Sequence, residues 1–438
     1  MRRPRIFYGW WVVVASSILG MFGNGSISQG FPRFFTPIRS ELGLSYSQMS
    51  LVFSLARAEG SAGGPLIGWV VDRFGARPMI LAGGLMAGIG IIFLSRANSY
   101  WELLVLFSGL ISLGKSAGFG QTLMAAVNQW FIRRRSLAMS TLMTAFAGGG
   151  AFVVLVLDWG IRELGWRDTL LWMGILVIAM TLPAAYFIRS RPEDMGMRPD
   201  GDPPADEGAG AGRRRAASGE VSFSFRQAIL TRTYWLIMVG AIIRVSATNG
   251  MLVHFFPIME LRGVSNSEAS LWYAAMFFLG IPLRFVMGVT SDKFRGNVLL
   301  AVGMVLGAFG MGGLWVVPGV FGMLLFVVGI AVVEGITSVN WLMLSDYYGR
   351  GRFATLMGFM SLFMNIGMFA TPLAAGYVAD RTDSYFIFLA VCTPLYLVSA
   401  VAFLLSTRPN PPASTRRRWI GTETTGAAQP AASGGDGN

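Results

Sequence analysis

The sequence predicts an all-α membrane protein with twelve membrane-spanning helices in two pseudo-symmetric bundles of six. Of its 438 residues, 53% are hydrophobic and only 13% are charged, about half the charged share of an average soluble chain. Apolar runs of roughly 18 to 25 residues, long enough to cross about 30 Å of hydrocarbon, recur along the whole chain. A charged segment near residue 72 returns 220 residues later, which indicates an internal duplication.

The twelve apolar runs are separated by segments rich in glycine, proline and charged residues. The first run follows a basic N-terminus, as in a signal peptide, but the many spans after it favour a first membrane helix. We expect a first bundle over 1–189, a linker over 190–233, a second bundle over 234–407 and a tail over 408–438. The runs cover approximately residues 8–31, 47–71, 79–95, 102–131, 137–158, 169–188, 234–256, 269–290, 298–316, 320–344, 354–377 and 385–405.

Basic residues predict the orientation in the membrane. We place 24 of the 35 Lys and Arg residues in segments on one face, four inside helices and seven in loops of the other face. Because cytoplasmic loops carry an excess of positive charge, both termini and the linker are predicted to be cytoplasmic, in an inner or plasma membrane. The seven cations of the outer face are Arg33, Arg39, Arg96, Arg162, Arg167, Arg262 and Arg381.

The linker and the tail have compositions that do not support a packed core. The linker is rich in Pro, Gly and Ala and contains three consecutive arginines, 213–215, so we expect it to be partly disordered. Within it, residues 222–230 are predicted to form a short amphipathic helix on the membrane. The tail, with arginines 416–418, is predicted to be disordered, and such a basic cluster beside a membrane span favours contact with anionic lipid.

The repeated segments connect the second and third spans of each half. In the first copy the glycines permit a tight turn, and the arginines hold the loop on the cytoplasmic side. Upstream, Ser45, Ser47, Ser50 and Leu51 return as Ser265, Ser267, Ser270 and Leu271. In the second copy Arg295 replaces the last glycine. The hinge residues are Gly68, Asp72, Arg73, Gly75 and Arg77 in the first copy and Gly288, Asp292 and Lys293 in the second.

Twelve spans, a long middle loop and these paired hinges resemble the major facilitator superfamily over residues 8 to about 407. The resemblance implies that the two halves rock about a substrate site near the bilayer midplane. It also implies that Asp72 and its arginines latch the halves together in the outward-facing state, against the start of the eleventh helix near Arg352.

Ionisable residues within the membrane are costly and normally face a cavity or a partner. None lies in the third helix of each triplet, which the superfamily places at the lipid-facing edge. With histidine neutral, four cations oppose two carboxylates, so the predicted cavity favours an anion. These residues are Arg57 and Glu59 in the second span, Lys115 in the fourth, Arg244 and His254 in the seventh, Arg284 in the eighth and Glu334 in the tenth.

Each of these charges has two interpretations. We expect Arg284 to contact substrate, while Arg57, Lys115 and Arg244 either contact substrate or serve packing. Glu334 is either a proton carrier, because burial favours the neutral carboxyl, or a structural partner of Lys115 or an arginine.

Two further proton-coupling candidates also have structural alternatives. Glu59 is expected in a structural salt bridge, and His254 in the lining of the outer mouth. Among the neutral polar residues of the spans, Gln29 and Asn365 are candidates for substrate hydrogen bonds or for contacts between helices.

Local stretches resemble the monocarboxylate transporters and their oxalate/formate exchanger relatives. The resemblance implies that the arginine of the eighth helix, here Arg284, binds the substrate carboxylate. That family has an aspartate one turn earlier, where this chain has Gly280, and a lysine in the first helix, where this chain has Gln29. The stretches are 8–13 (Tyr-Gly-Trp-Trp-Val-Val), 130–138, 191–196 (Arg-Pro-Glu-Asp-Met-Gly) and 284–288 (Arg-Phe-Val-Met-Gly).

Several other functions are disfavoured by the sequence. Residues 109–116 match the phosphate-binding pattern Gly-x-x-x-x-Gly-Lys-Ser, but they lie inside an apolar run rather than between a strand and a helix, so an ATP site is not expected. Lys and Arg punctuate apolar runs, so the net charge of +12 does not indicate nucleic-acid binding. We expect no enzyme activity, no metal and no cofactor.

The sequence therefore predicts a secondary active transporter of a small organic anion, a monocarboxylate moved with a proton. It is expected to act as a monomer in the lipid bilayer. Two alternatives stay open: an efflux pump for hydrophobic compounds, and a membrane receptor or scaffold that does not transport.

Overall fold

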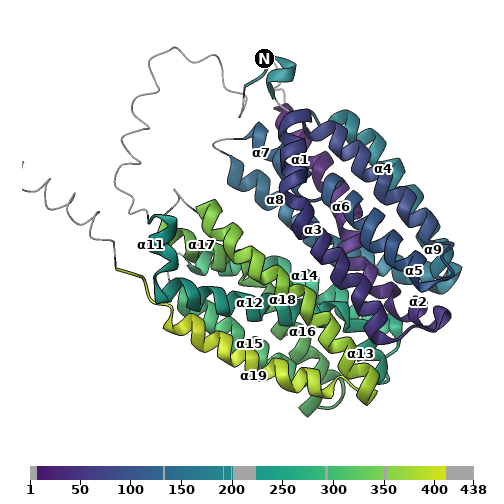
Figure 1. Ribbon diagram of the computed structural model, residues 1–438, viewed down its shortest axis with the longest axis vertical. Coiled ribbons are helices and arrows are strands. Elements are labelled where there is room, and N and C mark those ends of the chain that lie inside the picture. Colours follow the sequence, from purple (N-terminus) through teal and green to yellow (C-terminus); the bar gives the residue numbers. More distant parts are fainter. Residues whose placement is uncertain are drawn as a thin grey trace, which may run out of the picture.

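The structure, a computed structural model, describes residues 7–131, 134–190, 192–198, 200, 223–291, 294–349 and 353–410. Within these ranges the chain is almost entirely helical and contains no strand. Figure 1 shows two groups of helices side by side, one formed by the first part of the chain and one by the second. The predicted fold class is confirmed.

The helices of the first bundle follow the predicted spans closely. They are α1 (Tyr8–Leu19), the π-helix η1 (Gly20–Gly30), the 3₁₀ helix η2 (Phe31–Phe34), α2 (Phe35–Leu42), α3 (Tyr46–Phe74), α4 (Ala76–Leu94), α5 (Tyr100–Leu104), the π-helix η3 (Val105–Ile111), α6 (Ser112–Gly118), α7 (Gln121–Trp130), α8 (Arg135–Gly148), the π-helix η4 (Gly149–Val153) and α9 (Val154–Phe187).

The second bundle is preceded by the 3₁₀ helix η5 (Pro192–Met195) and the short helix α11 (Phe225–Ile229). Its helices are α12 (Arg232–Val253), α13 (Phe255–Leu261), α14 (Asn266–Ser291), α15 (Gly296–Val316), α16 (Gly319–Gly335), α17 (Thr337–Tyr348), α18 (Phe353–Thr382) and α19 (Phe386–Leu405).

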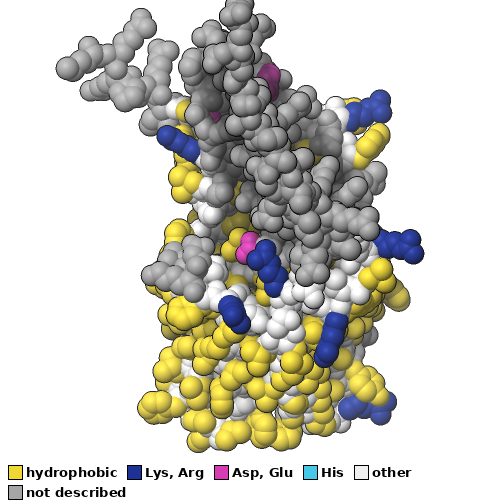
Figure 2. Space-filling view, turned by 90° about the vertical axis from the view of Figure 1, so that its left-hand side faces the viewer, with side chains coloured by type: hydrophobic (Ala, Val, Ile, Leu, Met, Phe, Trp, Pro, Cys, Tyr) yellow, Lys and Arg dark blue, Asp and Glu magenta, His cyan; other side chains and the backbone are white. Residues whose placement is uncertain are grey.

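Ten helical stretches of the described chain are long and apolar enough to cross a membrane. One of them, Leu137–Phe187, has 51 residues, and Gly165 breaks it with a left-handed φ of 82°, so it supplies two crossings. The 29-residue helix α3, which carries Arg57 and Glu59, lies where the second span is predicted. The helices are therefore consistent with twelve crossings, and hydrophobic side chains cover much of the described surface in Figure 2.

The first span is longer than predicted, because helical structure continues from Tyr8 to Leu42 rather than ending near residue 31. Arg33 is predicted to lie in an outer loop, but it lies in η2 and is only 3% exposed. Its Nε is 2.8 Å from Oδ1 of the buried Asp158 on α9. A paired arginine need not end a membrane helix, since its charge is balanced within the bundle.

The duplication seen in the sequence has structural counterparts. The Ser45 hydroxyl accepts a hydrogen bond from the Gln48 amide at the start of α3, and the Ser265 hydroxyl accepts one from the Glu268 amide at the start of α14. A serine at this position satisfies amides that the first helical turn leaves unpaired. The repeated serines therefore start equivalent helices in the two bundles.

Much of the linker and tail lies outside the described residues, as do arginines 213–215 and 416–418. The predicted helix over 222–230 is present in shorter form as α11, whose cap is Ser224. The backbone amide of Phe223 donates to the Tyr348 carbonyl at 3.1 Å. This contact ties the end of the linker to the end of α17.

The two bundles are joined at one end of the molecule, which contains the start of α3 and the end of α18. We call it the outer end, after the predicted orientation, and the opposite end, which contains Gly75 and Gly349, the inner end. Four hydrogen bonds described between the bundles lie at the outer end. The pairs are Thr36 with Glu260, the Tyr46 and Ser47 amides with Asp380, and Ser50 with His254.

Candidate functional site

An ion pair within the second bundle joins α14 to α16. Arg284 Nη2 on α14 is 3.1 Å from Glu334 Oε2 on α16, and both side chains are partly open, 32% and 24% exposed. Gly335 permits this contact, because a Cβ at that position would lie 3.1 Å from Leu283 Cβ. Glu334 is thus paired with an arginine in this structure, and its predicted role as a proton carrier stays a prediction.

Three charged residues of the first bundle gather around the start of α6. Arg57 and Lys115 line one small cavity of about 20 Å³ together with Ser112. The Ser112 hydroxyl donates to Glu59 Oε2 at 2.6 Å. The carboxylate expected in a salt bridge thus has a hydroxyl as its described hydrogen-bond partner, while Lys115 lies within its electrostatic range.

The charged groups of the two bundles influence each other across the molecule. Arg57 on α3 lies within electrostatic range of Glu334 on α16 and of the Tyr273 hydroxyl on α14. Lys115 in turn lies within range of Arg57 and Glu59. The structure thus brings together five of the predicted residues, two carboxylates and three cations, in a network that spans both bundles.

Arg244 is separate from the open part of this site. It lies on α12, is 2% exposed, and donates from Nη1 to Thr337 Oγ1 at 2.9 Å. Its charge is within electrostatic range of Glu334 and Arg284. A side chain so enclosed is not open to a substrate in this conformation.

His254 lies at the outer end, and its side chain is 0% exposed in this conformation. Its Nε2 lies 2.9 Å from Ser50 Oγ and 3.0 Å from the Pro372 carbonyl, and its Nδ1 lies 2.6 Å from the Tyr385 hydroxyl. The end of α12 is covered here by α3 and α18, so the predicted role in lining the outer mouth stays a prediction. His254 joins the two bundles at the outer end.

The two neutral candidates are partly buried. Gln29 lies in η1, and its Oε1 is enclosed without a hydrogen-bond partner in the described structure. Asn365 lies in the middle of α18. No described hydrogen bond engages either side chain, so both stay available for the predicted role.

The inner hinge is described in part. Gly75 has φ 86° and separates α3 from α4, and a Cβ there would lie 2.6 Å from Ser190 Oγ. Arg73 and Arg77 are exposed. The side-chain environments of Gly68 and Asp72, and all of Asp292, Lys293 and Arg352, lie outside the described residues, so the predicted latch stays a prediction.

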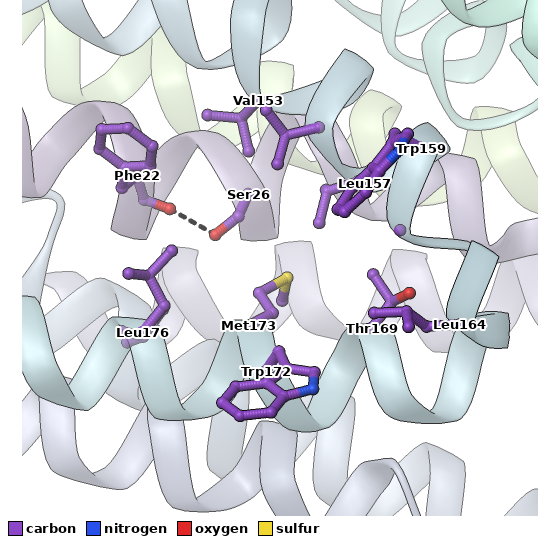
Figure 3. Close-up of a pocket in the computed structure, with 13 residues that line it drawn as sticks. Phe22, Ser26, Val153, Leu157, Trp159, Leu164, Thr169, Trp172, Met173 and Leu176 are labelled. Carbon is purple, nitrogen blue, oxygen red and sulfur yellow. Dashed lines mark hydrogen bonds between the residues drawn. The ribbon is translucent and has the colours of Figure 1, made fainter. Parts of the chain in front are cut away.

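An apolar pocket of about 390 Å³ lies away from these charges, between η1 and the two segments of α9. Figure 3 shows its lining, with Trp159 and Trp172 from the two segments of α9 and Phe22 and Ser26 from η1. The Ser26 hydroxyl donates to the Phe22 carbonyl. The Thr169 hydroxyl donates to the Gly165 carbonyl. The pocket therefore offers little polar recognition.

The phosphate-pattern residues 109–116 lie in η3 and α6, within a membrane-spanning stretch. This helical context lacks the loop that such a pattern needs to present its amides to phosphate.

Two residues of interest escaped the sequence analysis. Tyr273 carries no charge at neutral pH, so it does not stand out among the charged residues within the predicted membrane spans. Asp158 is the last residue of the predicted span 137–158, but the ionisable residues predicted to lie within the membrane do not include it. A buried acid at the end of an apolar run, with Arg33 at the end of another, is the signal that would have revealed their pairing.

The fold and the site define an integral, multi-pass membrane protein with a charged centre shared by two helical bundles. A sequence-family model described as the Major Facilitator Superfamily matches residues 15–344. The chain belongs to this superfamily.

Curated relatives cover most of this chain. The "Probable sulfoacetate transporter SauU" of Cupriavidus necator is 27% identical over 388 residues, covering 84% of this chain and 86% of the relative. Human "Monocarboxylate transporter 11" is 27% identical over 86% of this chain and 79% of its own. Rat "Monocarboxylate transporter 4" is 26% identical over 91% and 83%. The resemblance to the monocarboxylate transporter branch is confirmed.

Solved structures of other superfamily members share the fold. A bacterial homologue of the human lysosomal transporter Spinster superposes with a TM-score of 0.71 at 18% identity, covering 94% of this chain and 100% of that chain. A D-xylose-proton symporter gives a TM-score of 0.69 at 14% identity, covering 92% and 98%. At these identities the likeness shows the fold alone.

Proposed function

We propose that the protein is a secondary active transporter that moves a small organic anion, a monocarboxylate, together with a proton. The observation that carries this proposal is the partly open ion pair of Arg284 with Glu334, in electrostatic range of Arg57. A guanidinium group binds a carboxylate through two parallel hydrogen bonds. The geometry therefore suits an anion that competes with Glu334 for Arg284.

Competition for Arg284 supplies a route to coupling. In the resting structure Glu334 engages Nη2 of Arg284, while Arg284 Nε has no partner among the described residues. A substrate carboxylate entering this position would place two anions against one cation. Protonation of Glu334 removes that repulsion, so one proton would enter with each substrate anion. In this scheme Glu59 partly balances the positive charge of Lys115 within the first bundle and does not carry the proton.

The relatives support an organic anion as the substrate class. Those compared here are named for monocarboxylates and for sulfoacetate, and all of these molecules carry an acidic group that arginine binds. The aspartate that the monocarboxylate transporters place one turn before their arginine is Gly280 here. Glu334 reaches Arg284 from the neighbouring helix and would supply the missing carboxylate.

Alternating access would follow from the way the bundles meet. The described hydrogen bonds between them lie at the outer end, so we infer that this conformation is closed to the outside. The partly exposed Arg284 and Glu334 would then be reached from the cytoplasm, with both termini on that side. Rocking would break the outer contacts and bring the inner hinge at Asp72 toward the start of α18.

Counterflow in liposomes tests the proposal. Purified protein should exchange labelled lactate or sulfoacetate, and Arg284→Ala should abolish this exchange while leaving the protein folded. Arg226→Ala, on exposed surface of α11, is the matched control and should transport normally. Flux of lipophilic cations alone would instead indicate efflux of hydrophobic compounds, and no flux of any solute would indicate a receptor or scaffold.

A further inference from the structure

The environment of Arg244 suggests a role other than substrate contact. From α12 its Nη1 reaches Thr337 Oγ1 at 2.9 Å and lies 3.5 Å from the Val333 carbonyl. These two residues stand on either side of a break, since α16 ends at Gly335 and α17 begins at Thr337. Arg244 therefore touches both sides of one interruption in a membrane helix.

A helix end inside a membrane bundle needs such a partner. The last carbonyls of a helix have no intrahelical donor and carry partial negative charge. Where lipid or protein excludes water, an unsatisfied backbone group costs several kcal/mol. The guanidinium of Arg244 supplies both a donor and a positive charge to the end of α16.

The position of this break determines where Glu334 lies. Glu334 directly follows Val333, and the next residue, Gly335, is packed so closely against α14 that a Cβ would lie 3.1 Å from Leu283 Cβ and 3.6 Å from the Arg284 amide nitrogen. A shift of the α16 end would thus move the carboxylate relative to Arg284. Arg244 contacts the carbonyl of Val333, the residue directly before Glu334.

We propose that Arg244 is a positioning residue that grips the break between α16 and α17 and so holds Glu334 against Arg284, without meeting the substrate. This inference deepens the proposed function and rests on it for its effect on transport. Arg244 Nε and Nη2 are buried without hydrogen-bond partners among the described residues, so the described polar contacts of this guanidinium are those with the helix break.

The charges around Glu334 come from four elements. Arg284 and Tyr273 lie on α14, Arg57 on α3, Arg244 on α12 and Tyr396 on α19. Removing the charge of Arg244 changes the electrostatic environment of the Glu334 carboxylate while leaving Arg284 in place. A residue that acts through Glu334 should therefore alter the pH profile and turnover more than apparent substrate affinity.

Three variants separate the contributions. Arg244→Gln removes the charge, Arg244→Lys keeps it, and Thr337→Val removes one hydrogen-bond partner. We expect Arg244→Gln to lower kcat roughly tenfold and shift the pH profile, with KM little changed and partial rescue by Arg244→Lys. Thr337→Val should lower kcat less and leave the pH profile near that of the parent. A KM rise matching that of Arg284→Lys would show that Arg244 binds substrate and overturn the proposal, as would an unchanged pH profile in Arg244→Gln.

A second readout does not require transport. Cysteines replacing Leu283 and Gly335, in a Cys392→Ser background, should form a disulfide, because their Cβ atoms would lie 3.1 Å apart and a small outward shift brings them to the roughly 3.5–4.5 Å that a disulfide needs. Adding Arg244→Gln should slow this cross-linking several-fold, and Arg226→Gln should not. Unchanged cross-linking would overturn the proposal. If the parent protein moves no carboxylate, the proposed function fails, but the cross-linking result still tests the positioning role.

Discussion

The Asp380 carboxylate near the end of α18 accepts a hydrogen bond from the Tyr46 amide at the start of α3, at 2.7 Å. Its second oxygen accepts one from the Ser47 amide at 2.8 Å. An acid from one bundle thus caps a helix of the other, where exposed amides and the helix dipole favour negative charge. This contact would exist only while the outer end is closed.

Neutralising Asp380 should therefore favour opening of the outer end. Asp380→Asn removes the charge that faces the helix, and we expect the closed form to lose about 1 kcal/mol. Labelling from outside of a cysteine introduced at Ala56 should become faster in proteoliposomes. Asp383→Asn, an exposed acid three residues later, is the control, and equal labelling of the two variants would contradict the prediction.

His254 should matter for stability rather than for coupling to protons. His254→Phe leaves Ser50 and Tyr385 without their shared partner, and we expect a loss of about 1–3 kcal/mol, seen as a lower Tm. The pH dependence of transport should stay that of the parent. Tyr385→Phe removes only one of the contacts and should lower Tm less. If His254→Phe flattened the pH profile of transport, His254 would be a proton-coupling residue after all.

Glu334→Gln should separate exchange from proton-driven uptake. The glutamine resembles the protonated carboxyl at every pH, so Arg284 stays open to substrate while the variable proton site is gone. Uphill uptake driven by a pH gradient should be lost, and counterflow should persist. Glu59→Gln tests the other carboxylate in the same assay and should retain uphill uptake, since Glu59 lies with Ser112 and Lys115. Loss of uphill uptake in Glu59→Gln together with its retention in Glu334→Gln would instead identify Glu59 as the proton carrier.

The Arg33–Asp158 pair should be essential to the first bundle. Both side chains are buried, so Asp158→Asn leaves an enclosed cation without its counter-charge, and we expect a loss of about 3–5 kcal/mol. The double variant Arg33→Met with Asp158→Leu should recover much of the Tm. Arg162 also pairs with Asp158 at 3.3 Å but is 51% exposed, so Arg162→Ala should change stability by at most about 1 kcal/mol. A small effect of Asp158→Asn would mean that solvent reaches the pair.

Hydrophobic run length predicted the spans, because crossing hydrocarbon demands a fixed length of apolar helix. It misjudged the end at Arg33, since run length cannot reveal a counter-charge 125 residues away. The charged residues of the centre were likewise predicted individually, but their pairing was not. Lys115 and the arginines were all possible partners of Glu334, and only the packing of Gly335 against α14 selects Arg284. The contacts of His254 were likewise not predictable, because the sequence does not show which helices cover the end of α12.

The two hinges differ in what their backbones demand. Gly75 adopts φ 86°, whereas Arg295, at the equivalent position of the second copy, adopts φ −63° and ψ 125°. Any residue other than glycine is strained in the first conformation and comfortable in the second. The absence of this glycine from the second copy is therefore no evidence against transport, because the extended backbone at Arg295 does not require glycine. Of the two equivalent turns, the one at Gly75 depends on its glycine, and the one at Arg295 has a backbone that other residues also adopt.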